Sequence, residues 1–283
     1  MPLWPFSQVL HTAALVGAED ASTLRVSLEA YRRGTAYAER PRGRRRYYDD
    51  NAWIACGLLS FGDVEAARRV VEFLREGAVL GPDGAVGVRW VEGGAALHAC
   101  STGSTGLIAL RLGAVVGEGE RAPLAELAAG CTAFLEGLLD GDGLVADHRR
   151  ADGSVDPALY TYNQGLLIGL LTGHDRLDDA VALAGRVRRA FDAERLWAHP
   201  PAFTAILVRE LVRLDALRPE AELRSWCAAY LDRVWTQARA ADTGLFTGGG
   251  IGRYDDGVVL DHAALTGAMA VLATAPTPRP LSP

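Results

Sequence analysis

Two adjacent acids, Asp49 and Asp50, are the residues of this chain whose types and spacing best suit chemistry. They stand at the head of residues 52–60, which are apolar almost throughout, and two neighbouring carboxylates repel each other there. A single Asp at this position would be an ordinary helix N-cap, and capping is the alternative interpretation. Neighbouring side chains on a helix diverge, yet their carboxyl groups can lie about 5 to 6 Å apart, close enough to share the roles of nucleophile and general acid.

A second group of polar and aromatic side chains occupies residues 160–164, where Tyr160 and Tyr162 precede Asn163 and Gln164. An aromatic platform beside two amides suits a sugar ring, because the ring offers an apolar face and a fringe of hydroxyl groups. The alternative is structural, with Thr161 as a helix N-cap and both tyrosines buried.

Two further patterns are weaker. Residues 101–106 superficially resemble a phosphate-binding loop, but they lack its lysine and a preceding strand, so helix capping and close packing by the glycines are favoured. His98 with Cys100, and Asp261 with His262, could each begin a metal site, although neither pair has a third and fourth ligand at a recognisable spacing. We therefore predict no metal and no cofactor.

The overall charge excludes one class of partner. A net charge of -6 and an isoelectric point near 5.6 argue against a nucleic-acid surface, which needs concentrated positive charge. One basic run stands apart, with five arginines in residues 40–46 that lead directly to Tyr47. This run is either a solvated loop or a cationic rim that lowers carboxylate pKa values or contacts a charged substrate.

The elements that must position these residues are helices, because apolar residues recur mostly at helical spacing and strand-like alternation is rare. The pattern predicts eleven of them, where twelve would make six hairpins. Their approximate ranges are 6–16, 22–37, 50–60, 63–76, 102–116, 121–139, 162–173, 176–192, 202–214, 219–239 and 261–273. Glycine-rich segments at 77–88, 140–154 and 244–257 are predicted as surface loops, and residues 86–91 as a short hairpin strand.

The helices fall into two kinds. Some have a charged face, as expected at a surface, whereas those that begin near 49, 101, 161, 201 and 260 are apolar almost all round and must be surrounded by protein. An inner ring that alternates with an outer ring is the simplest packing. If the inner helices run parallel, their polar first turns converge on one mouth of the ring, where free N–H groups and helix dipoles also point. We place the functional site at that mouth.

The chain is predicted to form a single domain over residues 1–274, followed by a disordered proline-rich tail over 275–283. The first 17 residues lack the basic start and the uninterrupted apolar stretch of a secretory signal. No apolar run is long enough for a membrane span. These features lead to the expectation of a cytoplasmic protein that does not contact a membrane.

Four motifs, taken in order, resemble those of glycoside hydrolase family 76. They are residues 47–53 (YYDDNAW), the Ser/Thr-rich start of 101–116, residues 161–165 (TYNQG) and residues 203–209 (FTAILVR). The resemblance spans most of the chain, and it implies an all-α (α/α)6 barrel that hydrolyses α-mannosidic bonds, often α-1,6 bonds. Ile54 stands where the family often has an aromatic residue, and Thr204 where it commonly has Lys.

The resemblance also implies residue roles. Asp49 would be the nucleophile of a retaining mechanism, and Asp50 the general acid that later activates water. The carbohydrate partner would be contacted by the following residues: Tyr48, Trp53, Ser101, Thr102, Tyr162, Asn163 and Gln164.

Three other functions remain open. A different sugar-processing enzyme on the same scaffold, such as an epimerase or an unsaturated-uronide hydrolase, would need a catalytic His or acids placed across the barrel. A non-catalytic glycan-binding barrel would bind a glycan without turnover. A terpene-cyclase-like enzyme is disfavoured, because residues 49–53 lack the third acid of a metal-binding D-D-x-x-D run.

Overall fold

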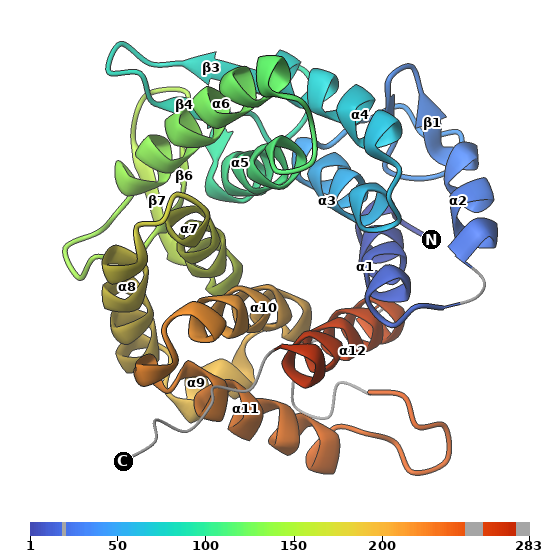
Figure 1. Ribbon diagram of the computed structural model, residues 1–283, viewed down its shortest axis with the longest axis vertical. Coiled ribbons are helices and arrows are strands. Elements are labelled where there is room, and N and C mark those ends of the chain that lie inside the picture. Colours follow the sequence, from blue (N-terminus) through green and yellow to red (C-terminus); the bar gives the residue numbers. More distant parts are fainter. Residues whose placement is uncertain (19–20, 247–256, 276–283) are drawn as a thin grey trace.

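The computed structural model describes residues 1–18, 21–246 and 257–275. Burial divides its helices into two layers (Figure 1). The inner layer consists of α1 (Leu3–Leu15), α3 (Tyr48–Ser60), α5 (Ala99–Gly113), α7 (Thr161–Gly173), α10 (Pro201–Leu217) and α12 (Gly257–Thr274). The outer layer consists of α2 (Ala21–Leu28), α4 (Val64–Gly77), α6 (Glu118–Glu136), α8 (Leu177–Ala190), the short α9 (Ala193–Ala198) and α11 (Leu223–Gln237).

The two layers follow from the sequence pattern. Helix α7 is apolar nearly all round, and most of its residues are buried between neighbours on every side. Helix α4 is amphipathic instead: Ala67, Val71 and Leu74 are buried, while its arginines and glutamates face outward. The Asp63 side chain caps α4 by accepting a hydrogen bond from the Ala66 backbone N–H at 3.1 Å.

The inner helices form a ring. Each packs against the next along the chain, and α12 packs against α1, which closes the ring (Figure 1). The outer helices pack on the outside of the inner ones, as α6 does on α5 and α8 on α7. This arrangement is the predicted all-α fold with alternating inner and outer helices.

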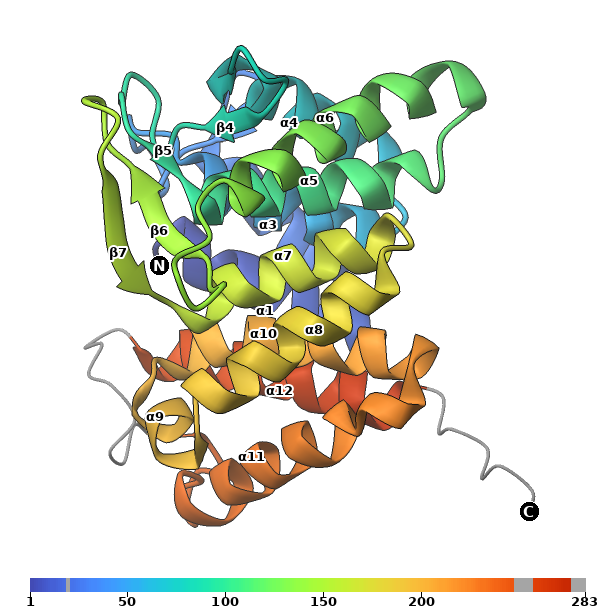
Figure 2. The same ribbon diagram turned by 90° about the vertical axis from the view of Figure 1, so that its left-hand side faces the viewer.

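Short strands lie at one end of the ring (Figure 2). Strands β1 (Arg32–Arg33) and β2 (Ala36–Tyr37) form one antiparallel pair, and β3 (Ala78–Leu80) and β4 (Val86–Val88) form another. A three-stranded antiparallel sheet consists of β5 (Leu97–His98), β6 (Ala146–Arg149) and β7 (Val155–Leu159). Two 3-10 turns, η1 (Glu29–Tyr31) and η2 (Pro219–Ala221), complete the described elements.

Several predicted elements differ from the structure. The helix predicted at 22–37 ends at Leu28, because Gly34 adopts a φ of +66° in the turn of the β1–β2 hairpin. Helix α9 was absent from the predicted set, since six residues are too few for a periodic signal. The segment predicted as a loop at 140–154 contains β6, while the hairpin strand predicted at 86–91 is confirmed as β4.

Parts of the predicted organisation lie beyond what the structure describes. Residues 276–283, most of the predicted tail, fall outside the described residues, as do 247–256 of the glycine-rich segment. The single-domain span and the disordered tail therefore stay predictions. Within the described ranges, none of the helices combines the length and the apolar character that crossing a bilayer requires.

Candidate active site

The first turns of the six inner helices meet at one cleft of about 870 Å³. The sequence predicted this convergence for five of them, and α1 is the sixth. Each inner helix, or the residue just before it, contributes to the lining. The aromatic lining residues are Trp4, Tyr47, Trp53, Trp90, Tyr160, Tyr162 and Phe203, and the acids are Glu39, Asp49, Asp50 and Asp147. The cleft thus combines carboxylates with apolar ring faces, which is the combination that a sugar requires.

Asp49 and Asp50 lie in the first turn of α3. The start of that helix is fixed because the Tyr48 backbone N–H donates to the Trp90 carbonyl at 2.9 Å. The Trp90 indole N–H in turn donates to Asp49 Oδ2 at 3.1 Å. The other carboxylate oxygen, Asp49 Oδ1, is buried and has no hydrogen-bond partner among the described residues. The Trp90 indole therefore orients one oxygen of Asp49.

The two acids differ in electrostatics. Burial raises the pKa of Asp49 to about 6, although hydrogen bonds from Trp90 and from the Asp50 backbone oppose the rise. Burial also raises the pKa of Asp50 well above its usual range, and the charges of Asp49 and then Glu39 raise it further. The two acids are therefore unequal: Asp50 has the higher pKa, so Asp49 ionises first as the pH rises, and the two titrate as a coupled pair.

Asp147 is a third carboxylate in the cleft, and the sequence analysis missed it. It lies at a register irregularity in β6, between Ala146 and His148, and lines the cleft. Its Oδ2 lies 2.8 Å from His148 Nδ1, and its Oδ1 accepts a hydrogen bond from Asn163 Nδ2 at 3.3 Å. The sequence placed Asp147 in a loop, and only the pairing of β6 with β5 and β7 brings it to the cleft.

His98, Asp147 and His148 are the one group of potential metal ligands found among the described residues, with ligand atoms within 4.8 Å of one another. The two imidazole rings stack with centroids 4.4 Å apart, as cross-strand partners on β5 and β6. Burial, and then His148, lower the pKa of His98 to about 4. Because both oxygens of Asp147 already have protein partners, the simplest interpretation is an acid held in place by hydrogen bonds. The absence of a metal stays a prediction.

Two predicted sugar-contacting aromatics do line the cleft. Trp53 lies one turn after the acids. Tyr162 packs edge-on against Phe203, with ring centroids 4.4 Å apart, and stacks with Tyr160 at 5.5 Å. Trp4 continues this wall by contacting Phe203 at 5.5 Å.

Other predicted sugar-contacting residues lie elsewhere. Tyr48 is buried and stacks on Phe73 of α4, with ring centroids 4.6 Å apart. Successive side chains on a helix point in different directions, so Tyr48 faces the outer layer while Asp49 faces the cleft. Ser101 and Thr102 are also buried, and Thr102 Oγ1 accepts a hydrogen bond from the Val88 backbone N–H at 2.8 Å. These three residues join layers of the barrel and do not line the cleft.

Gln164 does not line the cleft either. Its side-chain amide pairs with both backbone groups of Val145, accepting at 2.9 Å and donating at 2.8 Å. Asn51 holds Tyr37 in the same way, at 2.8 and 2.9 Å. Asn163 is buried behind the cleft, where it orients Asp147. The amides of these motifs therefore build the walls of the site.

In sequence comparisons the chain matches no protein-family model and no curated protein. Solved structures, in contrast, match over nearly its whole length. A family 76 glycoside hydrolase (mannosidase) from Bacteroides thetaiotaomicron has 20% identity and a TM-score of 0.78, covering 96% of this chain and 88% of its own. The α-1,6-mannanase of a Salegentibacter species has 21% identity and a TM-score of 0.73, covering 96% of this chain and 90% of its own.

A third similar structure is Dfg5 from Chaetomium thermophilum in complex with glucosamine, with 12% identity and a TM-score of 0.69, covering 97% of this chain and 80% of its own. The shared architecture is that of the (α/α)6 barrels of glycoside hydrolase family 76. The fold and the family resemblance expected from the four motifs are thereby confirmed. At these identities the likeness establishes the fold, and the activity has to be argued from the cleft.

Proposed function

We propose that this protein is a retaining glycoside hydrolase that cleaves α-mannosidic bonds, with α-1,6 bonds as the first candidates. The observation that carries the proposal is the pair Asp49 and Asp50, two adjacent acids of unequal pKa in a cleft lined by aromatic rings. A retaining glycosidase needs one ionised and one protonated carboxyl group close together.

The chemistry proceeds in two displacements. A carboxylate oxygen of Asp49, which lines the cleft, attacks the anomeric carbon while Asp50 donates its proton to the departing glycosidic oxygen. The bond to the leaving group breaks, and a mannosyl ester forms on Asp49. Asp50, now ionised, takes a proton from water, which attacks the same carbon and releases Asp49. Two inversions give net retention of the anomeric configuration.

The surroundings support this division of roles. The first turn of α3 places the positive end of the helix dipole beside Asp49, and the Asp50 backbone donates a hydrogen bond to its carboxylate, which both stabilise an anionic Asp49. The negative charge of Glu39 also raises the pKa of Asp50, adding to the repulsion by Asp49 that favours its protonated form. Asp147 and the Tyr162–Phe203 wall would bind hydroxyl groups and the apolar ring face, respectively.

The solved structures of similar proteins support a mannoside as the substrate. Two forms of the Salegentibacter α-1,6-mannanase are described as inactive, with two consecutive aspartates replaced, and they are complexed with α-1,6-mannotetrose or α-1,6-mannotriose. The present chain also carries two consecutive aspartates, and they open an inner helix at the mouth of the same fold.

The test is hydrolysis of an α-1,6-mannotetraose and of aryl α-mannosides, with the anomer of the first product recorded by proton NMR. We expect the α-anomer. Asp49→Asn should abolish turnover of every substrate. Asp50→Asn should spare only the first displacement on aryl mannosides whose leaving group needs no protonation, so their kcat/KM is kept while kcat falls because the ester on Asp49 is hydrolysed slowly. A β-anomer would contradict the retaining mechanism, and binding of mannosides without turnover would favour a glycan-binding barrel.

A further inference from the structure

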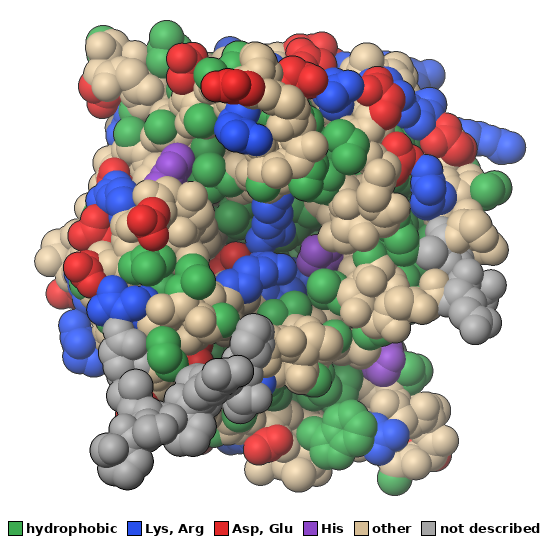
Figure 3. Space-filling view, in the orientation of Figure 1, with side chains coloured by type: hydrophobic (Ala, Val, Ile, Leu, Met, Phe, Trp, Pro, Cys, Tyr) green, Lys and Arg blue, Asp and Glu red, His purple; other side chains and the backbone are tan. Residues whose placement is uncertain are grey.

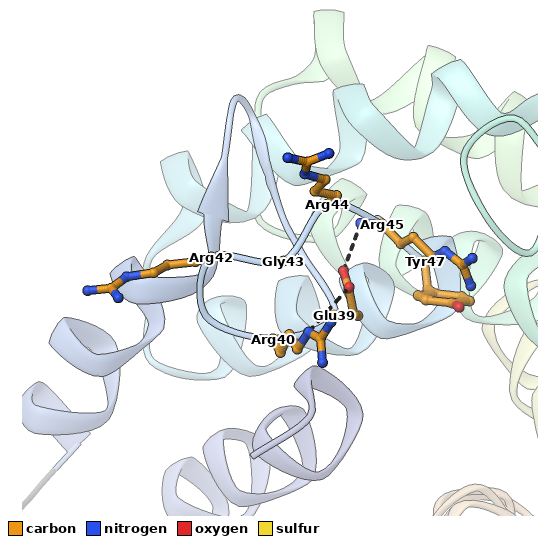
Figure 4. Close-up of a pocket in the computed structure, with 7 residues that line it drawn as sticks. All are labelled: Glu39, Arg40, Arg42, Gly43, Arg44, Arg45 and Tyr47. Carbon is orange, nitrogen blue, oxygen red and sulfur yellow. Dashed lines mark hydrogen bonds and ion pairs between the residues drawn. The ribbon is translucent and has the colours of Figure 1, made fainter.

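A cationic loop, residues 40–45, borders the cleft beside Tyr47 (Figure 4). Its four arginines are all exposed: Arg40, Arg42, Arg44 and Arg45. With Glu39 and Tyr47 they line a hollow of about 420 Å³. Glu39, Arg40 and Tyr47 line both this hollow and the cleft, so the two spaces are continuous. A glycan chain that leaves the cleft on this side would meet the loop.

The loop has a defined backbone. A tight turn forms where the Gly43 N–H donates to the Arg40 carbonyl at 2.8 Å, with Arg42 in the left-handed region at a φ of +59°. The ends of the loop are joined because the Arg45 N–H donates to a Glu39 carboxylate oxygen at 2.8 Å, and the Glu39 N–H donates to the Arg45 carbonyl at 2.9 Å. The guanidinium groups are therefore presented from a fixed base, which lowers the entropic cost of binding a ligand.

The charges of the loop are not balanced. Arg46, next along the chain, is neutralised by Glu92 at 2.5 Å and lies over the Phe73 ring. By contrast, no acidic side chain in the described part of the structure forms an ion pair with Arg42, Arg44 or Arg45. A local excess of positive charge thus adjoins the cleft of a protein whose net charge is -6.

We propose that this loop binds a phosphate group carried by the glycan, so that the preferred substrate is a phosphorylated α-mannoside chain. The guanidinium fork matches the oxygens of a phosphate, and several exposed arginines on one loop suit its charge better than that of a single carboxylate. A phosphate would supply the negative partner that these arginines lack. The arginines in turn would offset the repulsion that an anionic glycan meets at the acids of the cleft. The inference rests on the proposed function, because it extends the same cleft outward.

The experiment compares a phosphorylated manno-oligosaccharide with the same oligosaccharide after phosphatase treatment. The kcat/KM values are measured for the parent protein, for Arg44→Gln/Arg45→Gln, and for Arg188→Gln/Arg189→Gln. The last variant removes the same charge from an adjacent, exposed pair on the outer helix α8. Calorimetric affinities for both glycans, measured in the Asp49→Asn background, give a second readout that needs no turnover.

We expect the parent to prefer the phosphorylated glycan by about tenfold, with the preference weakening at high salt concentration because exposed charges are screened. The loop variant should lose most of this preference, and the α8 variant should keep it. The proposal would be overturned if the parent had equal kcat/KM values and equal affinities for the two glycans, or if its preference survived in the loop variant. If neither glycan is hydrolysed but the calorimetric preference holds, the hydrolase assignment fails and the loop assignment stands.

One other outcome assigns the loop differently. Binding to vesicles that contain phosphatidylserine, lost in the loop variant and accompanied by equal affinity for the two glycans, would overturn the phosphoglycan site and identify a membrane contact instead.

Discussion

The two mouths of the barrel carry opposite charges. At the end where the inner helices begin, the cleft holds Asp49, Asp50 and Asp147. At the end where they finish, Arg111 and Arg213 both bond to the buried Glu210. Figure 3 looks onto this second end and shows basic side chains at the centre of a hollow. Both placements suit the helix dipoles, which favour anions at N-termini and cations at C-termini.

The mouths differ in how their charges are compensated. Burial alone would raise the pKa of Glu210, but Arg213 and Arg111 outweigh it and lower that pKa. Deeper in the barrel, Arg209 donates to Gln8 at 3.0 Å, and burial followed by the charge of Arg213 lowers its pKa to about 9. At the cleft, burial prevails instead, and the pKa values of both aspartates are raised. Paired charge stabilises one mouth, and uncompensated charge is left available for chemistry at the other.

The largest effect should follow from breaking the compensated mouth. Glu210→Gln leaves Arg111 and Arg213 without their shared counter-charge and should lower the free energy of unfolding by about 3 to 5 kcal/mol, with little change in kcat of the folded enzyme. Because the pKa of Glu210 is depressed, its contribution is present above pH 4.5 and is lost as the pH falls through the folded-state pKa. Urea unfolding at a series of pH values measures the loss of stability and its pH dependence.

The control for this variant is Glu194→Gln, which breaks the exposed ion pair with Arg233, where the Glu194 side chain is 77% exposed. Such a pair contributes about 0 to 1 kcal/mol. Equal losses in the two variants would mean that the Glu210 cluster is not the stabilising element.

A smaller loss of stability should follow from Gln164→Ala, which removes both side-chain hydrogen bonds to the Val145 backbone. Leaving these buried groups unpaired should cost about 2 kcal/mol, and KM should rise because Asp147 lies two residues further along the chain. Gln237→Ala, at an exposed position on α11, is the matched control. An unchanged KM would show that Asp147 is positioned without help from this contact.

The pH dependence of kcat/KM should be bell-shaped. Activity needs Asp49 ionised, so it should fall about tenfold per pH unit below pH 6, the region of the Asp49 pKa. It should fall again at higher pH when Asp50 loses its proton. The two limbs belong to the coupled pair. A profile that is flat from pH 4 to 7 would contradict the raised pKa of Asp49, the proposed nucleophile.

The smallest effect should follow from Trp90→Phe, which keeps the ring against Tyr47 and removes the N–H that donates to Asp49. That hydrogen bond lowers the pKa of Asp49, so its loss should move the acidic limb upward by about half a pH unit. Trp235→Phe, on the outer helix α11, should leave the limb unchanged. If the acidic limb stays in place in Trp90→Phe, this hydrogen bond does not set the pKa of Asp49.

Much of this architecture could be predicted from the sequence, because buried helices that are apolar all round leave an unmistakable pattern. The inner helices were found within a few residues, and their polar first turns located the cleft. The periodicity could not show that Tyr48 packs against the outer helix α4 and not into the cleft, since a shift of one residue turns a side chain by about 100°.

The elements that were missed share a physical cause. Asp147 and His98 reach the cleft through strands of four and two residues, whose pairing partners lie far apart in sequence. Gln164 looked like a sugar ligand, but its amide satisfies the backbone of a neighbouring loop, and nothing in its own segment reveals that partner. Non-local pairing of this kind needs the structure.

The central claim is that the Asp49 carboxylate is retained for chemistry at some cost in stability, and Asp49→Asn tests it most directly. Turnover of α-1,6-mannotetraose and the free energy of unfolding at pH 8 are measured side by side with the parent. We predict that turnover is lost while stability is unchanged or rises by about 1 to 2 kcal/mol, because a buried charge has been removed. A variant that still turns over, or one that is inactive because it is less stable than the parent, would contradict the account.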